Sequence, residues 1–131
     1  MKLFIDASAL VAILMTEPGF EVLSDAASAA DQLFTSGLTR WETVRAMTRI
    51  NQMSPSIATR QLEALLSRFD VVNVAIGERE AELAIEAHRQ YGKGNHDARL
   101  NMGDCFAYAC AKANGAKLLY KGGDFALTDL A

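Results

Sequence analysis

The chain has 131 residues, of which 50% are hydrophobic and 22% are charged, and its formal net charge is −3. This length and composition suit a single folded domain with its own core and exclude a disordered chain. No apolar run reaches the ~20 residues that a membrane-spanning helix needs, and the acidic balance counts against nucleic-acid binding through bulk charge.

The first part of the chain alternates short apolar strands with helices. The expected elements are a strand at 3–5, a helix at 9–14, a helix at 18–30, a strand at 32–35 and a helix at 39–52. Ser8 is predicted to cap the first helix. Thr39 and Glu42 have the T-x-x-E spacing of a capping box, which places the start of the third helix at Thr39.

The second part continues the same alternation. The expected elements are a helix opened by Ser54-Pro55, a strand at 71–74, a helix at 78–91, a loop at 92–97, a helix at 101–114 and a strand at 117–121. Asn101 is the predicted cap of the last helix, and Gly122-Gly123 turn the last strand into Asp124. Strands separated by helices predict an α/β fold with a parallel sheet covered on both faces, in one domain over 1–131.

The N-terminus indicates a cytoplasmic protein, and the two cysteines are not expected to form a disulfide. Asp6 interrupts the N-terminal apolar run, which is unlike a signal peptide. Cys105 and Cys110 are five residues apart in a helical pattern, which places them on different faces and too far apart for a disulfide. We expect both to be buried, reduced thiols.

Four acids fall where the predicted strands end. Asp6 follows the first strand and Asp124 follows the last, and ligands of open parallel sheets bind at the carboxyl ends of the strands. Glu42 and Asp104 lie near the starts of predicted helices, which begin at the same edge. We therefore expect the four side chains to converge on one site.

Each acid also has a structural interpretation. Glu42 can serve the capping box, Asp104 can favour a helix N-terminus, Asp6 can cap the first helix, and Asp124 can sit in an ordinary turn. Converging carboxylates repel one another, however, and a hard divalent cation removes that conflict. Such an ion lowers the pKa of water and stabilises a leaving oxygen during phosphodiester hydrolysis.

Several segments together resemble a known family. They are 4–10, 41–42, 101–109 and 118–129, and they resemble, in order, the PIN-domain ribonuclease toxins of bacterial type II (VapBC) toxin–antitoxin modules. The resemblance implies a three-layer α/β/α sandwich and an endoribonuclease that uses Mg²⁺ or Mn²⁺. It also implies a small antitoxin partner and a homodimer, for which the helices at 40–52 and 56–68 are the candidate surface.

The resemblance assigns roles to individual residues. Asp6 and Asp104 resemble the principal metal ligands, and Glu42 resembles a glutamate that binds metal directly or through water. Asp124 resembles the fourth acid. Further positions resemble supporting polar neighbours or a lower-ranked fifth acid: Ser8, Thr128 and Asp129.

Six basic residues are candidates to hold RNA phosphates, and we expect at most half of them to touch substrate. They are Arg40, Arg45, Arg49, Lys93, Arg99 and Lys121. Lys121 is the first choice because it is nearest to Asp124. Trp41 and Tyr108 are candidates to stack on bases, although core packing is the commoner role for such aromatics.

Three other classes of protein remain alternatives. A phosphoacceptor signalling domain needs an acidic pair after the first strand, where this chain has Asp6-Ala7. A phosphatase with an aspartyl nucleophile needs a second Asp at the position of Ser8. A catalytically silent binding protein of the same fold would have no need of four intact acids. Metal-ion hydrolysis alone does not distinguish RNA from DNA, for which contacts to the 2′-OH are required.

Overall fold

Helices and strands alternate along the chain in the order that the sequence predicts. The structure is a computed structural model that describes residues 1–131. Its elements are β1 Lys2–Ile5, α1 Ala7–Leu14, α2 Phe20–Ala29, β2 Gln32–Ser36, α3 Gly37–Asn51, α4 Pro55–Arg68, β3 Val72–Val74, α5 Glu78–Tyr91, α6 Met102–Ala113 and β4 Lys117–Leu119. None of the helices is both long and apolar enough to cross a bilayer.

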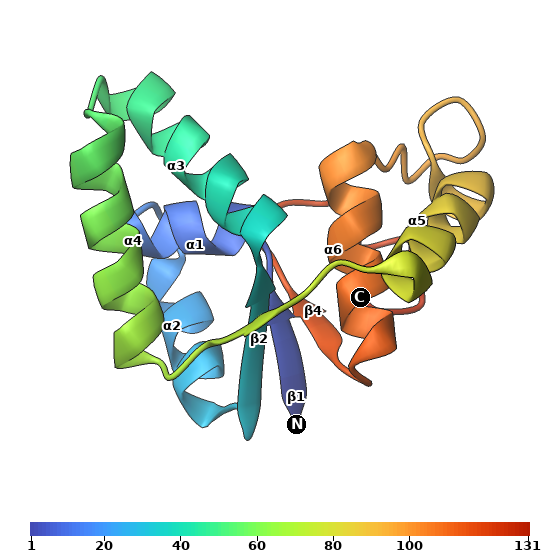
Figure 1. Cartoon of the computed structure of the whole chain (residues 1–131), viewed down its shortest axis with the longest axis horizontal. Coiled ribbons are helices and arrows are strands. Elements are labelled where there is room, and N and C mark those ends of the chain that lie inside the picture. The colour runs from blue at the N-terminus through green and yellow to red at the C-terminus, as the bar shows by residue number, and fades with distance from the viewer.

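The four strands form one parallel sheet in the order β3-β2-β1-β4. Phe4 of β1 stands opposite Phe34 of β2 and Leu118 of β4. Helices α1 to α4 lie on one face of the sheet, and α5 and α6 lie on the other (Figure 1). The predicted three-layer sandwich with a central parallel sheet is confirmed.

Successive residues of the central strand supply two separate cores, because strand side chains alternate between faces. Leu3 and Ile5 pack into the core beneath α1 and α4, with Leu10 and Leu62. Phe4 packs into the opposite core. This double burial explains why residues 3–5 of β1 are all apolar.

Two helix starts differ from the prediction. Helix α1 is capped by Asp6, whose carboxylate accepts from the backbone N–H of Ser8 at 3.1 Å, so Ser8 is not the cap. Helix α3 is capped by Ser36, whose hydroxyl accepts from the Thr39 N–H at 3.2 Å. In both cases the residue at the strand end takes the cap because helix and strand meet without a loop. Glu42 therefore lies outside any capping box.

The predicted cap of α6 is confirmed. The side chain of Asn101 accepts from the Asp104 N–H at 2.9 Å, and the Asp104 carboxylate accepts from the Asn101 N–H at 3.1 Å. Cys105 and Cys110 on this helix are both free and buried, as expected.

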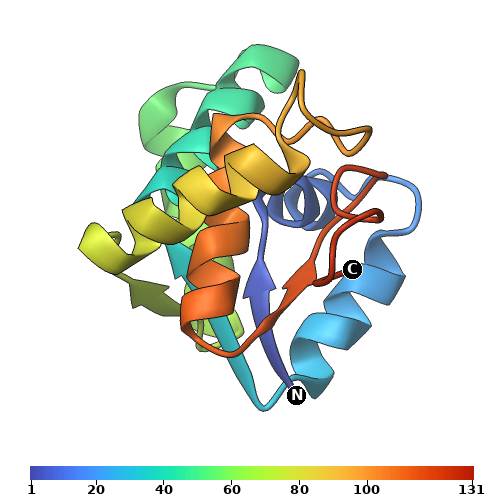
Figure 2. The same cartoon turned by 90° about the vertical axis from the view of Figure 1, so that its right-hand side faces the viewer.

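The C-terminal segment folds back beside β4 (Figure 2). Phe125 and Leu130 bury their side chains in the core under α5 and α6. Asp129 anchors the segment, because one of its carboxylate oxygens accepts from the hydroxyls of Tyr91 at 3.3 Å and Tyr108 at 2.5 Å.

Removing this anchor is expected to destabilise the fold. Lys112 also pairs with Asp129, and burial of the carboxyl is outweighed by the hydrogen bonds from Lys112 and Tyr108, which hold its pKa below the usual value. Asp129→Ala leaves the buried Tyr108 hydroxyl unpaired, so we expect a loss of about 1–2 kcal/mol in the free energy of unfolding. Urea denaturation measures it. Asp97→Ala, at an exposed loop acid, is the control and should change stability by less than about 0.5 kcal/mol.

Candidate active site

The predicted acids lie at one edge of the sheet. Asp6 directly follows β1, and Asp124 follows β4 after a short loop. Glu42 and Asp104 lie in the first turns of α3 and α6, which begin at the same edge. The carboxyl ends of the parallel strands thus bring together acids that are far apart in the sequence.

Asp6 is fixed in place by its neighbours. Its side chain is only 6% exposed, and its Oδ2 accepts from the Ser8 hydroxyl at 2.7 Å as well as from the Ser8 N–H. The Asp6 N–H donates to the Leu119 carbonyl at 2.9 Å, which ties the residue to the end of β4. Burial raises the pKa of Asp6, and the charge of Asp124 raises it further, although the bonds from Ser8 oppose both.

Asp104 is held just as closely. It is 8% exposed, and its reciprocal bonds with Asn101 fix the carboxylate at the start of α6. Burial raises its pKa to about 6, opposed by the bond from the Asn101 backbone and assisted by the charges of Asp124 and Asp6. Its helix-capping role and a role in the site are therefore compatible.

Glu42 reaches across from α3 to the start of α6. Its carboxylate packs against the bare backbone of Gly103, where an added Cβ would come within 1.9 Å of Oε2. Burial raises the pKa of Glu42 to about 7, and the charges of Asp6 and Asp104 contribute to the rise. The Glu42 side chain therefore lies between α3 and α6, where the charges of both buried aspartates affect its pKa.

Gly103→Ala is expected to impair the site without unfolding the protein. The new methyl group must displace the Glu42 carboxylate, whereas alanine favours the helix by ~1 kcal/mol over glycine. If Glu42 contributes to catalysis, a displacement of about 1 Å should cost on the order of 100-fold in rate. Gly37→Ala, where an added Cβ meets nothing within 4 Å, is the matched control. Unchanged activity in Gly103→Ala would show that the position of Glu42 is unimportant.

The site concentrates negative charge that no base neutralises. None of the ion pairs in the molecule involves Asp6, Glu42, Asp104 or Asp124. As placed, no three of these side chains form a ready-made cage for one ion. The donor chemistry nevertheless fits Mg²⁺, which usually takes only one or two carboxylates and keeps several waters.

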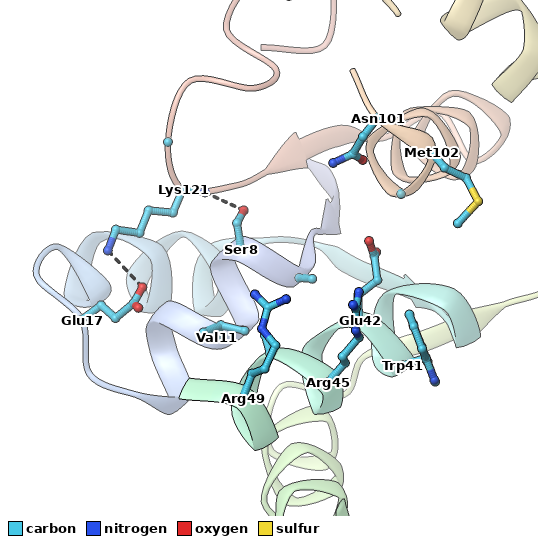
Figure 3. A pocket seen from close by; sticks show the side chains of 14 residues that line it. Ser8, Val11, Glu17, Trp41, Glu42, Arg45, Arg49, Asn101, Met102 and Lys121 are labelled. Carbon is cyan, nitrogen blue, oxygen red and sulfur yellow. Dashed lines mark hydrogen bonds and ion pairs between the residues drawn. The ribbon is translucent and has the colours of Figure 1, made fainter. Parts of the chain in front are cut away.

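A groove of about 690 Å³ runs past the acids between α1, α3 and α6 (Figure 3). Glu42 lines it directly, as do the neighbours of the buried aspartates: Ala7, Ser8 and Gly103. One of the four acids therefore lines the groove, and residues next to Asp6 and Asp104 in the chain line it as well.

Three of the six predicted basic residues line the groove. Arg45 and Arg49 lie four residues apart on α3, and Lys121 faces them from the loop after β4 (Figure 3). The Lys121 ammonium donates to Glu17 at 3.0 Å, and the Lys121 N–H donates to the Ser8 hydroxyl at 3.0 Å. Arg49 and Lys121 therefore provide positive charge on one side of the groove, whereas Arg45 lies over the ring of Trp41.

Other sequence candidates lie elsewhere. Arg40 pairs with Glu63 on α4, and Lys93 and Arg99 line a hollow in the loop before α6. The Thr128 hydroxyl donates to the Phe125 carbonyl at 2.8 Å, within the C-terminal segment.

Tyr108, a candidate to stack on bases, and Asp129, a candidate fifth acid, both have structural roles. Tyr108 is buried and, like Asp129, belongs to the anchor of the C-terminal segment. Asp129 is therefore not a fifth acid of the site.

Three groove residues to which sequence reasoning assigned no role have one in the structure. Glu17 supplies the partner of Lys121, Gly103 makes room for Glu42, and Met102 lies exposed on the groove wall. Only Gly103 carried a signal, because a glycine in the first turn of a helix usually marks a close approach.

Comparisons with known proteins agree with this geometry. Residues 3–130 match the family described as PIN domain. The chain is 40% identical to a VapC ribonuclease of Rhizobium meliloti, over 97% of this chain and 98% of that protein. It is 43% identical to a Ribonuclease VapC of Mycolicibacterium smegmatis, over 97% and 96%.

Solved structures of lower sequence identity share the fold. The VapC20 toxin of Mycobacterium tuberculosis superposes with a TM-score of 0.76 at 19% identity, covering 98% of this chain and 96% of that one. VapBC-1 of nontypeable Haemophilus influenzae gives a TM-score of 0.65 at 16% identity, covering 90% and 84%.

Proposed function

This chain belongs to the PIN-domain family, and we propose that it is a divalent-cation-dependent endoribonuclease, the toxin of a VapBC-type toxin–antitoxin module. Two relatives that align along almost their whole length with this chain are VapC ribonucleases. The four acids, the groove and its basic side chains supply the parts that hydrolysis of an RNA strand requires.

The observation that carries the proposal is the unneutralised charge of the site. Burial and mutual repulsion raise the pKa of Glu42 to about 7 and that of Asp104 to about 6, while no base pairs with either. Mg²⁺ or Mn²⁺ would relieve this repulsion, since both ions prefer carboxylate oxygens. The ligands, directly or through water, are Asp6, Glu42, Asp104 and Asp124.

A cation bound there supplies the charge that activates an attacking water and stabilises the leaving oxygen. The residues of the chain orient the site around it. Ser8 holds the Asp6 carboxylate, Asn101 holds that of Asp104, and Gly103 leaves space for Glu42. Because hydrogen bonds fix the carboxylates of Asp6 and Asp104 before substrate binds, these two groups need little reorganisation during the reaction.

Lys121→Ala is expected to weaken RNA binding at little cost in stability. Lys121 is exposed and lines the groove, so its ammonium can exchange Glu17 for a phosphate. Loss of one phosphate contact on a single strand should reduce the slope of log K against log salt by about 0.7. Lys2→Ala, at the opposite end of β1, is the control. A salt dependence that Lys121→Ala leaves unchanged would remove this residue from the RNA site.

We also propose two protein partners. The first is a small antitoxin, as the VapBC complexes among the structural relatives suggest. The second is another copy of this chain, for which α3 and α4 present the exposed apolar side chains of Ile50 and Ile57. The proposal places this module in the cytoplasm.

Incubation of the purified chain with labelled RNAs tests the activity. We expect cleavage with Mg²⁺ or Mn²⁺, none with EDTA, and none of a DNA of the same sequence. Matching the RNA and DNA sequences isolates the contribution of the 2′-OH. Cleavage that survives EDTA would contradict a metal-dependent mechanism. Failure to cut any RNA once copurifying partners are removed would favour a protein that only docks.

A further inference from the structure

Trp41, the only tryptophan of the chain, lies exposed beside the carboxylate site. It directly precedes Glu42 on α3, lines the groove, and is 57% exposed. An aromatic residue in the first turns of a helix usually packs inward, but the residues that α3 buries are Thr39, Thr43 and Met47. The indole is therefore turned away from the core and lies exposed at the edge of the groove.

A cation holds the indole in place. The Arg45 guanidinium lies over the Trp41 ring, 5.5 Å from its centroid, one helical turn further along α3. This contact orients the ring, yet more than half of Trp41 stays accessible. The indole thus offers a restrained but open aromatic face next to Glu42.

The facing wall is also apolar at this end. Met102, the first residue of α6, is 64% exposed and lines the same groove. Figure 3 shows Met102 and Trp41 on opposite walls, on the same side of Glu42. Lys121 and Glu17 lie on the other side of the groove, so the exposed side chains of Trp41 and Met102 are separated from this ion pair (Figure 3).

We propose that Trp41 is a stacking platform for one nucleobase of a single-stranded RNA that binds along the groove. This inference rests on the proposed function, because the carboxylate site must face the phosphodiester backbone. A nucleotide has an anionic backbone and an apolar, planar base. The groove offers cationic side chains that can contact the backbone and an aromatic side chain that can contact the base. Base–aromatic stacking tolerates any base, so Trp41 positions the strand and does not read its sequence.

Intrinsic fluorescence reports this contact directly, because Trp41 is the only tryptophan. The probes are fluorescein-labelled hexamers of uridine and of adenosine, and a hexamer of abasic ribose phosphates with the same charge. All proteins carry Asp104→Asn, so that the probes stay intact in Mg²⁺. Anisotropy of the label measures binding, and tryptophan emission measures stacking.

We expect saturating uridine or adenosine hexamer to quench the emission of Trp41, and the abasic hexamer to leave it unchanged. Trp41→Ala should weaken binding of the base-bearing hexamers by roughly 5- to 150-fold and leave abasic binding unaltered. Val22→Ala is the control, because Val22 on α2 is an exposed apolar residue (73%) that does not line the groove.

Two results would overturn the stacking role. One is equal emission with base-bearing and abasic hexamers at saturation. The other is a Trp41→Ala variant that binds the base-bearing hexamers as tightly as the protein with Trp41 does, or that loses affinity for base-bearing and abasic hexamers by the same factor. Either would leave the proposed nuclease standing, since RNA would still bind the groove. If no hexamer binds at all, the platform is refuted, and cleavage by the wild-type chain then decides separately on the proposed function.

Discussion

Asp104→Asn is expected to abolish metal-dependent RNA cleavage while leaving the fold intact. The amide is nearly the same size as the carboxylate but has no charge to offer a divalent cation. Loss of a principal ligand should reduce the cleavage rate by at least ~10³-fold, which corresponds to ~4 kcal/mol of transition-state stabilisation.

The same substitution, Asp104→Asn, should increase the stability of the metal-free protein. The amide oxygen can still accept from the Asn101 N–H, so the cap of α6 remains. The substitution also removes one of the charges that raise the pKa of Glu42. Without metal, we expect Asp104→Asn to be more stable than the wild type by on the order of 1 kcal/mol at pH 8.

Initial cleavage rates of a labelled RNA, together with urea denaturation in EDTA, measure both effects. Asp25→Asn, at an acid on α2 for which no hydrogen bond or ion pair is present, is the matched control and should change neither quantity. Wild-type cleavage rates in Asp104→Asn would exclude this residue as a ligand. Loss of activity accompanied by unfolding would instead make its role structural.

The metal-free protein is expected to lose stability as pH rises from about 4.5 to about 8. The pKa values of Glu42 and Asp104 are raised in the fold to about 7 and about 6, from ordinary values of 4.5 and 3.8. In this range the folded state binds more protons than the unfolded state, so the free energy of unfolding falls with pH. Burial raises the pKa of Asp6 in the same direction.

The expected loss is about 1–3 kcal/mol, because Glu42 is partly exposed and water screens its charge. The stabilising contribution of these acids is complete below their unfolded pKa values and is lost as pH passes through the folded ones. Acids whose pKa is lowered, such as Asp129, make the free energy of unfolding rise with pH, but this change occurs at lower pH. Urea denaturation in EDTA at several pH values gives the profile.

Mg²⁺ should reverse this loss. The cation binds deprotonated carboxylates, so it should raise the midpoint of unfolding strongly at pH 8 and little at pH 5. Glu42→Gln should make the free energy of unfolding in EDTA less dependent on pH, because Glu42 has a higher pKa than Asp104. A free energy of unfolding that does not change with pH in the wild type, or equal stabilisation by Mg²⁺ at both pH values, would contradict mutual repulsion among the carboxylates of the site.

The sequence predicts the layers of the fold well because hydrophobic periodicity and strand–helix alternation are local signals. Helix α5 begins and ends at the expected residues, and the expected cap of α6 is present. The predicted caps of α1 and α3 were wrong because Asp6, directly after β1, and Ser36, the last residue of β2, cap these helices instead. Whether a strand passes into a helix without a loop depends on the tertiary packing and not on the capping motif.

The site was accessible to sequence reasoning for a different reason. Positions that follow parallel strands share one edge, so Asp6 and Asp124 could be placed together from the order of elements alone. The partners of each acid could not be predicted in this way. Contacts such as Gly103 against Glu42, or Tyr108 with Asp129, depend on how two helices pack.

The exposure of Trp41 could not be predicted either, because the expected start of α3 was wrong. A capping box at Thr39 would have placed the start of the helix three residues too late. With the cap at Ser36, Thr39, Thr43 and Met47 form the buried stripe at helical spacing, and Trp41 falls outside it.

Calorimetric titration with Mn²⁺ in the absence of RNA tests the central claim, that the four carboxylates form one divalent-cation site. The comparison is between the wild-type chain and the paired variant Asp6→Asn with Asp104→Asn, with Asp25→Asn as a protein of reduced charge elsewhere. We predict saturable binding of Mn²⁺ by the wild type and by Asp25→Asn, and none by the paired variant. Equal Mn²⁺ binding by all three proteins would show that these carboxylates do not hold the ion.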